Sequence, residues 1–144
     1  MGDVPAEALT DLRADNNELS FWRVEYDHSD IDIVLAAVAS ARDRLDKLDY
    51  TLLDEALLAE LSIKHTRAEG KTPHAYANQQ SHTDLIELTV QKISQLAHRM
   101  MPLKRERVSE KHVTRVLVEA LQNGALERTR IKEKLLSQLE SAAA

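Results

Sequence analysis

The residues of this chain that are best suited to chemistry are basic and gather between positions 99 and 115. Ser109 is a good helix N-cap, but the position three residues later, where an acid would answer the free N–H groups of the first turn, is His112. Free N–H groups at a helix start, together with Lys and Arg side chains, can hold a phosphate or a carboxylate. The segment therefore predicts a surface that binds an anion or a partner. Its candidate residues are Arg99, Lys104, Arg105, Arg107, Lys111, His112 and Arg115.

Nucleic acid is one anionic partner that this segment could contact, and a nucleic-acid-binding helical protein that uses residues 99–115 is the alternative function. Two predicted helices joined by a short Asn-Gly turn follow it and could be mistaken for a helix-turn-helix. The basic residues have no aromatic residues between them for stacking on bases, and the whole chain carries a net charge of −5. These features favour an acidic protein surface over DNA as the partner.

The remaining sequence offers no arrangement typical of an enzyme. The chain has no cysteine, which excludes thiol catalysis and thiolate zinc sites. Its 6 histidines are scattered without an HExxH pair, and its 3 glycines cannot build a phosphate-binding loop. No serine stands in a nucleophile elbow. We therefore expect a protein that is not an enzyme, with no catalytic residues, no cofactor and no metal.

Acidic and basic residues are divided between the two parts of the chain. Residues 1–62 hold 15 Asp and Glu against 5 Lys and Arg, whereas residues 63–144 hold 9 against 14. Such asymmetry concerns surface fields and partners rather than fold. The acidic part could contact the basic part of a second copy, attract a basic partner, or pack against the basic part of its own chain. The sequence leaves these alternatives open, and with them the oligomeric state.

The composition and the spacing of apolar residues predict an all-α fold, a helical bundle of about five helices. The chain is 43% hydrophobic but only 3% aromatic, with 3 Gly and 3 Pro, which is typical of helices packed by Leu, Ile, Val and Ala. Apolar residues recur every three or four positions in five segments. The predicted helices are 31–48, 51–63, 83–100, 110–123 and 126–141.

Three segments do not follow this helical pattern. Residues 19–26 are rich in aromatic and β-branched residues and could form a short extended piece or, equally, a helical turn that leads toward Ser29. In either case the Phe and Trp side chains are expected to fill the core. Residues 64–80 hold almost no large apolar side chain, which predicts a long flexible connection. Residues 1–17 are expected to be a tail or a short helix, so that 18–144 form a single helical domain.

Three of the predicted helix starts carry an acidic capping box, in which a hydroxyl residue is followed three positions later by an acid. The negative charge of the acid interacts favourably with the unpaired N–H groups and with the positive end of the helix dipole. These acids are therefore expected to be structural rather than functional. The pairs are Ser29 with Asp32, Thr51 with Asp54, and Ser81 with Asp84.

Together these observations predict a protein that binds another macromolecule through charged helical surfaces. It would be a non-enzymatic protein–protein interaction module or the small subunit of a larger assembly, with a protein partner or self-association expected ahead of nucleic acid. No stretch approaches the ~18 apolar residues of a membrane span, and residues 1–10 lack a signal-peptide pattern. A cytoplasmic location without membrane contact is therefore expected.

Overall fold

The computed structural model describes residues 3–6, 19–25 and 27–143, and it is a mixed α/β fold. The prediction of an all-α helical bundle is therefore wrong. Along the chain the elements are β1 (Asp3–Ala6), β2 (Leu19–Trp22), α1 (Ile31–Ser40), β3 (Leu48–Asp54), α2 (Glu55–Glu60), β4 (Lys64–Arg67), α3 (Ala75–Gln80), β5 (His82–Ile86), α4 (Val90–Met100), β6 (Arg105–Val108), α5 (Glu110–Gln122) and α6 (Glu133–Ala143). A 3₁₀ turn, Arg128–Arg130, precedes the last helix.

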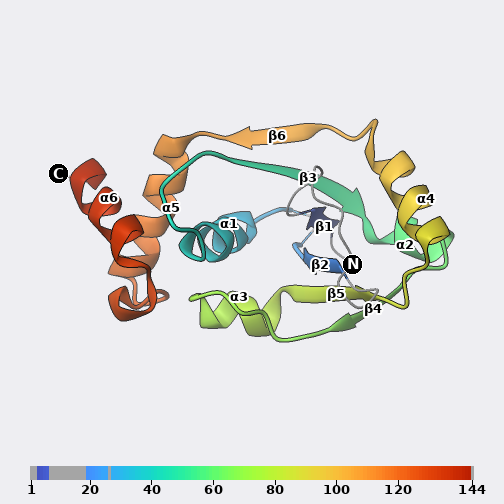
Figure 1. Ribbon diagram of the computed structural model, residues 1–144, viewed down its shortest axis with the longest axis horizontal. Coiled ribbons are helices and arrows are strands. Elements are labelled where there is room, and N and C mark those ends of the chain that lie inside the picture. Colours follow the sequence, from blue (N-terminus) through green and yellow to red (C-terminus); the bar gives the residue numbers. More distant parts are fainter. Residues whose placement is uncertain (1–2, 7–18, 26, 144) are drawn as a thin grey trace.

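The strands form antiparallel ladders in the spatial order β4-β5-β2-β1-β3-β6. β5 lies between β4 and β2 in a three-stranded ladder, and β3 pairs with β6 in a two-stranded one. β1 pairs with both β2 and β3 and joins the two ladders. In Figure 1 the β3–β6 ribbon runs along the top of the molecule and β5 along the bottom, with α5 and α6 at one end and α2 and α4 at the other.

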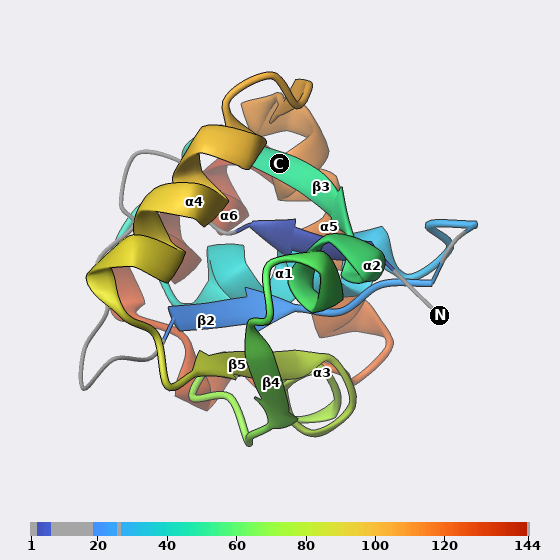
Figure 2. The same cartoon turned by 90° about the vertical axis from the view of Figure 1, so that its right-hand side faces the viewer.

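Two large groups of buried side chains occupy the two ends of the sheet. The first joins α1, the β3–β6 ribbon, α5 and α6, and its members include Leu35, Leu48, Val108, Leu117 and Leu135. The second lies where α2 and α4 cover the strands, as the end-on view of Figure 2 shows, and its members include Phe21, Leu53, Leu58, Leu85 and Leu96. A smaller third group surrounds Trp22. The core therefore extends along the sheet rather than filling the centre of a bundle.

The extended piece predicted within residues 19–26 is confirmed by β2. It pairs with β5, with Phe21 opposite Thr83 and Trp22 opposite His82. Phe21 and Trp22 are each only 2% exposed, so both fill the core as expected. Of the tail predicted for residues 1–17, positions 3–6 form β1 and the rest lie outside the described residues.

The helix predicted at 51–63 is a strand followed by a short helix. β3 contains Tyr50 and Thr51, an aromatic and a β-branched residue that suit a strand. Asp54 then starts α2, because its side chain accepts a hydrogen bond from the Ala56 N–H at 2.9 Å. Leu53 in the strand and Leu57 in the helix pack in the same buried group, so their regular spacing reflected a shared core and not one helical face.

The helix predicted at 83–100 is divided in the same way. His82–Ile86 is β5, which is paired on both sides by β2 and β4. Glu87 follows with a φ of 54°, a left-handed conformation that ends the strand. Thr89 then caps α4 by accepting a hydrogen bond from the Lys92 N–H at 3.1 Å, so only the second part of the predicted segment is helical.

The three predicted capping boxes are not formed. Ser29 does not cap α1, because the helix starts after Asp30, whose side chain makes no capping hydrogen bond. Thr51 lies within β3, and Ser81 lies between α3 and β5. The acids Asp32, Asp54 and Asp84 are therefore not the third residues of capped helices.

The predicted start and end of the fourth helix are confirmed by α5. The Ser109 hydroxyl accepts a hydrogen bond from the His112 N–H at 3.2 Å. The helix ends before Asn123, and Gly124 has a φ of 83°, which glycine adopts without strain.

The segment 64–80, predicted to be a long flexible connection, forms β4, a turn and α3. Polar contacts replace the apolar side chains that the segment lacks. Asn78 is buried, and its side-chain oxygen accepts hydrogen bonds from the Thr72 N–H at 3.1 Å and the Thr72 hydroxyl at 2.6 Å. The buried His74 caps α3 through Nδ1, which accepts from the Ala77 N–H at 3.2 Å. Hydrogen bonding therefore specifies the turn.

The buried cap makes stability depend on the protonation of His74. Burial holds the pKa of His74 below its ordinary value, so as the pH falls below about 6.5 the unfolded chain takes up a proton that the folded chain resists. Stability should therefore fall with decreasing pH. We expect His74→Asn, which keeps a capping oxygen, to lose less stability between pH 7.5 and 5.5 than the parent does, measured by urea unfolding. The exposed His98→Asn is the control, and an unchanged drop for His74→Asn would count against this role.

Candidate functional site

The structure distributes the seven predicted site residues over three elements and a loop, and it pairs most of them with carboxylates. Arg99 is on α4, Lys104 is in the loop before β6, Arg105 and Arg107 are on β6, and the last three are on α5. The contacts are Arg99 with Glu60 at 3.0 Å, Lys104 with Glu106 at 3.0 Å, Arg107 with Asp49 at 2.9 Å, His112 with Asp32 at 3.0 Å, and Arg115 with Glu119 at 3.6 Å. Arg105 and Lys111 have no ion pair among the residues that the structure describes.

Several of these contacts join the acidic part of the chain to the basic part. Arg107 donates to both oxygens of Asp49, at 2.9 and 3.1 Å, and holds the pKa of that carboxyl below its ordinary value. Asp43 in the acidic part likewise forms an ion pair with Lys132 in the basic part. Exposed pairs of this kind contribute little to stability, but they reduce the opposite surface fields. Part of the opposite charge of the two segments is therefore paired within the chain. This is the third of the alternatives that the sequence left open, in which the acidic part packs against the basic part of its own chain.

A pocket of about 460 Å³ lies where the starts of α1 and α5 approach the β3–β6 ribbon. Two of the seven predicted residues, Arg107 and His112, line it, whereas the other five do not: Arg99, Lys104, Arg105, Lys111 and Arg115. The lining residues are His28, Ser29, Ile31, Asp32, Leu35, Tyr50, Glu106, Arg107, Val108, Ser109 and His112. The pocket therefore takes residues from three segments that are distant in the sequence.

The floor of this pocket is apolar and its rim is charged. Leu35 and Val108 belong to the first buried group, and Tyr50 packs against them. Burial raises the pKa of the Tyr50 phenol above its ordinary value, and the nearby charges of Glu106 and Asp32 raise it further, against a lowering by Lys104. The phenol therefore stays protonated at neutral pH, and it lies in the field of two carboxylates.

His112 connects the two helix starts across the rim. Its Nε2 donates to Asp32 Oδ1 at 3.0 Å, since a carboxylate can only accept. The Arg115 guanidinium approaches the other oxygen of Asp32 at 3.9 Å. Asp32 is thus paired with His112, which is 37% exposed, and with Arg115, which is 53% exposed, whereas Glu106 is paired with Lys104, which is 83% exposed.

Tyr50, Asp32 and Glu106 were missed as site residues from the sequence. Asp32 was assigned to a capping box, and Tyr50 preceded a predicted helix. The missing signal was strand pairing: Tyr50 lies opposite Glu106, and Asp49 lies opposite Arg107. Runs of β-forming residues with complementary charges at residues 48–51 and 105–108 are a weak signal of that pairing.

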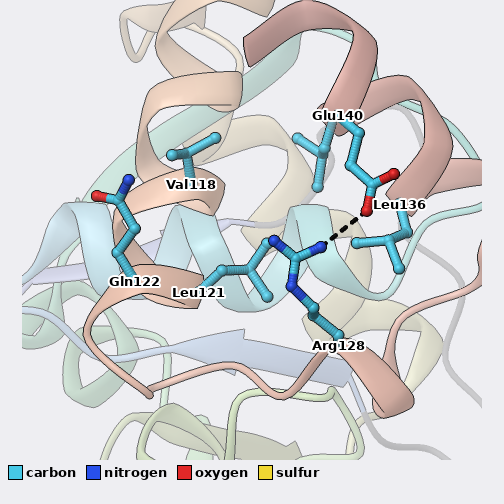
Figure 3. A pocket seen from close by; sticks show the side chains of 7 residues that line it. Val118, Leu121, Gln122, Arg128, Leu136 and Glu140 are labelled. Carbon is cyan, nitrogen blue, oxygen red and sulfur yellow. Dashed lines mark hydrogen bonds and ion pairs between the residues drawn. The ribbon is translucent and has the colours of Figure 1, made fainter. Parts of the chain in front are cut away.

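A second, smaller hollow of about 210 Å³ lies between α5 and α6. Figure 3 shows Val118 and Leu121 on α5 facing Leu136 on α6, with the Arg128–Glu140 ion pair across the opening. That pair has a length of 2.8 Å and its side chains are more than half exposed. The hollow combines aliphatic side chains with one satisfied ion pair.

The described part of the chain contains no group of three or more His, Cys, Asp or Glu side chains that could hold a metal ion. No helix in it is long and apolar enough to cross a membrane. Comparison with protein-family models, curated proteins and solved structures found no match. Statements about function therefore rest on the residues of the pocket.

Proposed function

We propose that this protein is a non-enzymatic protein–protein interaction module that recognises its partner through the pocket between α1, α5 and the β3–β6 ribbon. The observation that carries the proposal is the combination, in one pocket of about 460 Å³, of an apolar floor with a charged rim. Protein interfaces have this anatomy, with an aromatic or aliphatic centre and polar groups around it. Tyr50 supplies the aromatic centre, and Asp32, Glu106 and His112 supply the rim.

The position of β6 supports a protein partner. β6 is the last strand in the sheet order and, among the residues that the structure describes, pairs with β3 alone, so its outer backbone edge faces away from the sheet. Open edges of this kind are used for recognition of extended segments. The pocket begins at this strand, because Glu106, Arg107 and Val108 line it.

The charges that line the pocket give nucleic acid no comparable support. Binding to a phosphate backbone depends on several Lys and Arg side chains gathered on one surface. Of the seven predicted residues only Arg107 and His112 line the pocket, and the carboxylates of Asp32 and Glu106 in the same pocket would repel a phosphate. A protein partner therefore fits the site better.

Reversal of one rim charge tests the proposed function. We expect Glu106→Lys, used as immobilised bait, to recover its partner from a lysate of the producing organism at least about tenfold less well than the parent bait. Glu133→Lys makes the same charge change at an exposed position on α6 and should leave recovery unchanged. The recovered proteins are quantified by mass spectrometry. Equal recovery by all three baits, or no specific protein on any of them, contradicts the proposal.

A further inference from the structure

We infer that the pocket receives a cationic group on an aliphatic stem, the guanidinium or ammonium end of an Arg or Lys side chain presented by the protein partner. This inference rests on the proposed function and adds the chemistry of the group that is recognised. Two carboxylates, Asp32 on α1 and Glu106 on β6, line the same pocket together with the Tyr50 ring. A cation placed there can contact both carboxylates and the aromatic ring.

The two carboxylates already have contacts within the chain, and a cation that enters the pocket would compete with them. Asp32 contacts the half-buried His112 at 3.0 Å and the exposed Arg115 at 3.9 Å. Arg107 directs its Nε and Nη2 to Asp49, which does not line the pocket. Lys104 contacts Glu106 with a side chain that is 83% exposed. Exposed pairs of this kind are weak and are readily exchanged for a better-placed partner. Glu106 is therefore available to a cation that arrives from outside.

The apolar floor suits the stem of a basic side chain. Leu35 and Val108 are buried in the first group of core side chains, and Tyr50 is half-buried against them. Long basic side chains cover such surfaces with their methylene groups while the charged end reaches polar atoms. An anionic ligand would instead meet Asp32 and Glu106, whose negative charge also raises the pKa of the Tyr50 phenol.

The experiment is an NMR titration of the whole chain with four small probes. These are N-acetyl-argininamide, N-acetyl-lysinamide, the neutral N-acetyl-citrullinamide and the acidic N-acetyl-glutamic acid amide. We expect the arginine or lysine probe to shift the resonances of Tyr50 and His112 with saturation, and the neutral and acidic probes to bind at least about tenfold more weakly. Equal binding of the citrulline probe, preferred binding of the acidic probe, or no binding of either basic probe overturns the inference.

Matched variants locate the binding and separate this inference from the proposed function. Glu106→Gln and Asp32→Asn should each weaken the basic probe about fivefold or more, whereas Glu133→Gln should not. An excess of the basic probe should also release the captured partner from the parent bait. If capture depends on Glu106 but no basic probe binds or competes, the inference fails and the proposed function stands. If the probe binds and no protein is captured, the cation site is one for a free amine and the proposed function fails.

Discussion

Replacing Asn78 with alanine is expected to lower the free energy of unfolding by about 2–4 kcal/mol. The side-chain oxygen of Asn78 accepts from the Thr72 N–H and hydroxyl, and its amide donates to the Thr72 carbonyl at 2.7 Å. Thr72 and Asn78 are both buried, so the substitution leaves polar groups without partners in a place that water reaches poorly. Each buried unpaired group costs about 1–3 kcal/mol, and entry of water lowers the sum.

The expected loss is large because the segment has few other sources of stability. α3 has only 6 residues, and a helix so short is not stable by its own propensity. The backbone of Gly70 also donates to the Asn78 carbonyl at 3.0 Å, so the turn folds back on the helix at this residue. Loss of the Asn78 side chain should therefore destabilise the segment that connects β4 to β5.

The measurement is urea unfolding of the parent, Asn78→Ala and the neighbouring Gln79→Ala. Gln79 is exposed and contributes only its backbone carbonyl, which accepts from Arg67 at 3.1 Å. Gln79→Ala should therefore stay within about 0.5 kcal/mol of the parent. A loss below about 1 kcal/mol for Asn78→Ala would show that the turn does not depend on this network.

The elements that the sequence predicted correctly are those whose signals are local. Ser109 caps α5, and Gly124 takes the left-handed conformation after it. Each of these features is decided by a few adjacent residues. Residues 19–22 are extended, as their aromatic and β-branched content indicated. Of the helix predicted at 31–48, residues 31–40 form α1, but the prediction is wrong for 41–48, because the helix ends at Ser40 and Leu48 begins β3. The helix predicted at 126–141 likewise begins only at Glu133.

The errors arose where apolar spacing is shared by a strand and a helix that bury the same core. Leu53 and Leu57, and likewise Leu85 and Leu96, pack in one buried group although they lie in different elements. Periodicity cannot separate a buried strand from a buried helix over so short a length. The segment 64–80, predicted as a long flexible connection, forms β4 and α3 for another reason. The prediction counted apolar residues, whereas Thr72, His74 and Asn78 hold this segment by hydrogen bonds.

The candidate site was located only in part for a related reason. The basic segment 99–115 was recognised, but its partners lie far away in the sequence. Asp32 and His112 are separated by 80 positions, and Asp49 and Arg107 by 58. Only the antiparallel pairing of β3 with β6, and the packing of α1 on α5, bring these groups together. The pocket is thus a property of the tertiary structure. In the sequence it is indicated only by the division of acidic and basic residues between the two parts of the chain.

Replacing Leu117 with alanine is expected to lower the free energy of unfolding by about 3–5 kcal/mol. Leu117 on α5 has no exposed surface and lies in the buried group that joins α1, α5, α6 and the β3–β6 ribbon. Alanine is a better helix former than leucine, so the loss comes from the cavity and not from the helix itself. The exposed Gln122→Ala on the same helix should stay within about 0.5 kcal/mol of the parent.

Urea unfolding of the parent and both variants is the measurement. A loss for Leu117→Ala below about 2 kcal/mol would mean that the helices do not share one core. Leu35 belongs to the same group and forms the pocket floor, so this core also holds the walls of the proposed binding site in place.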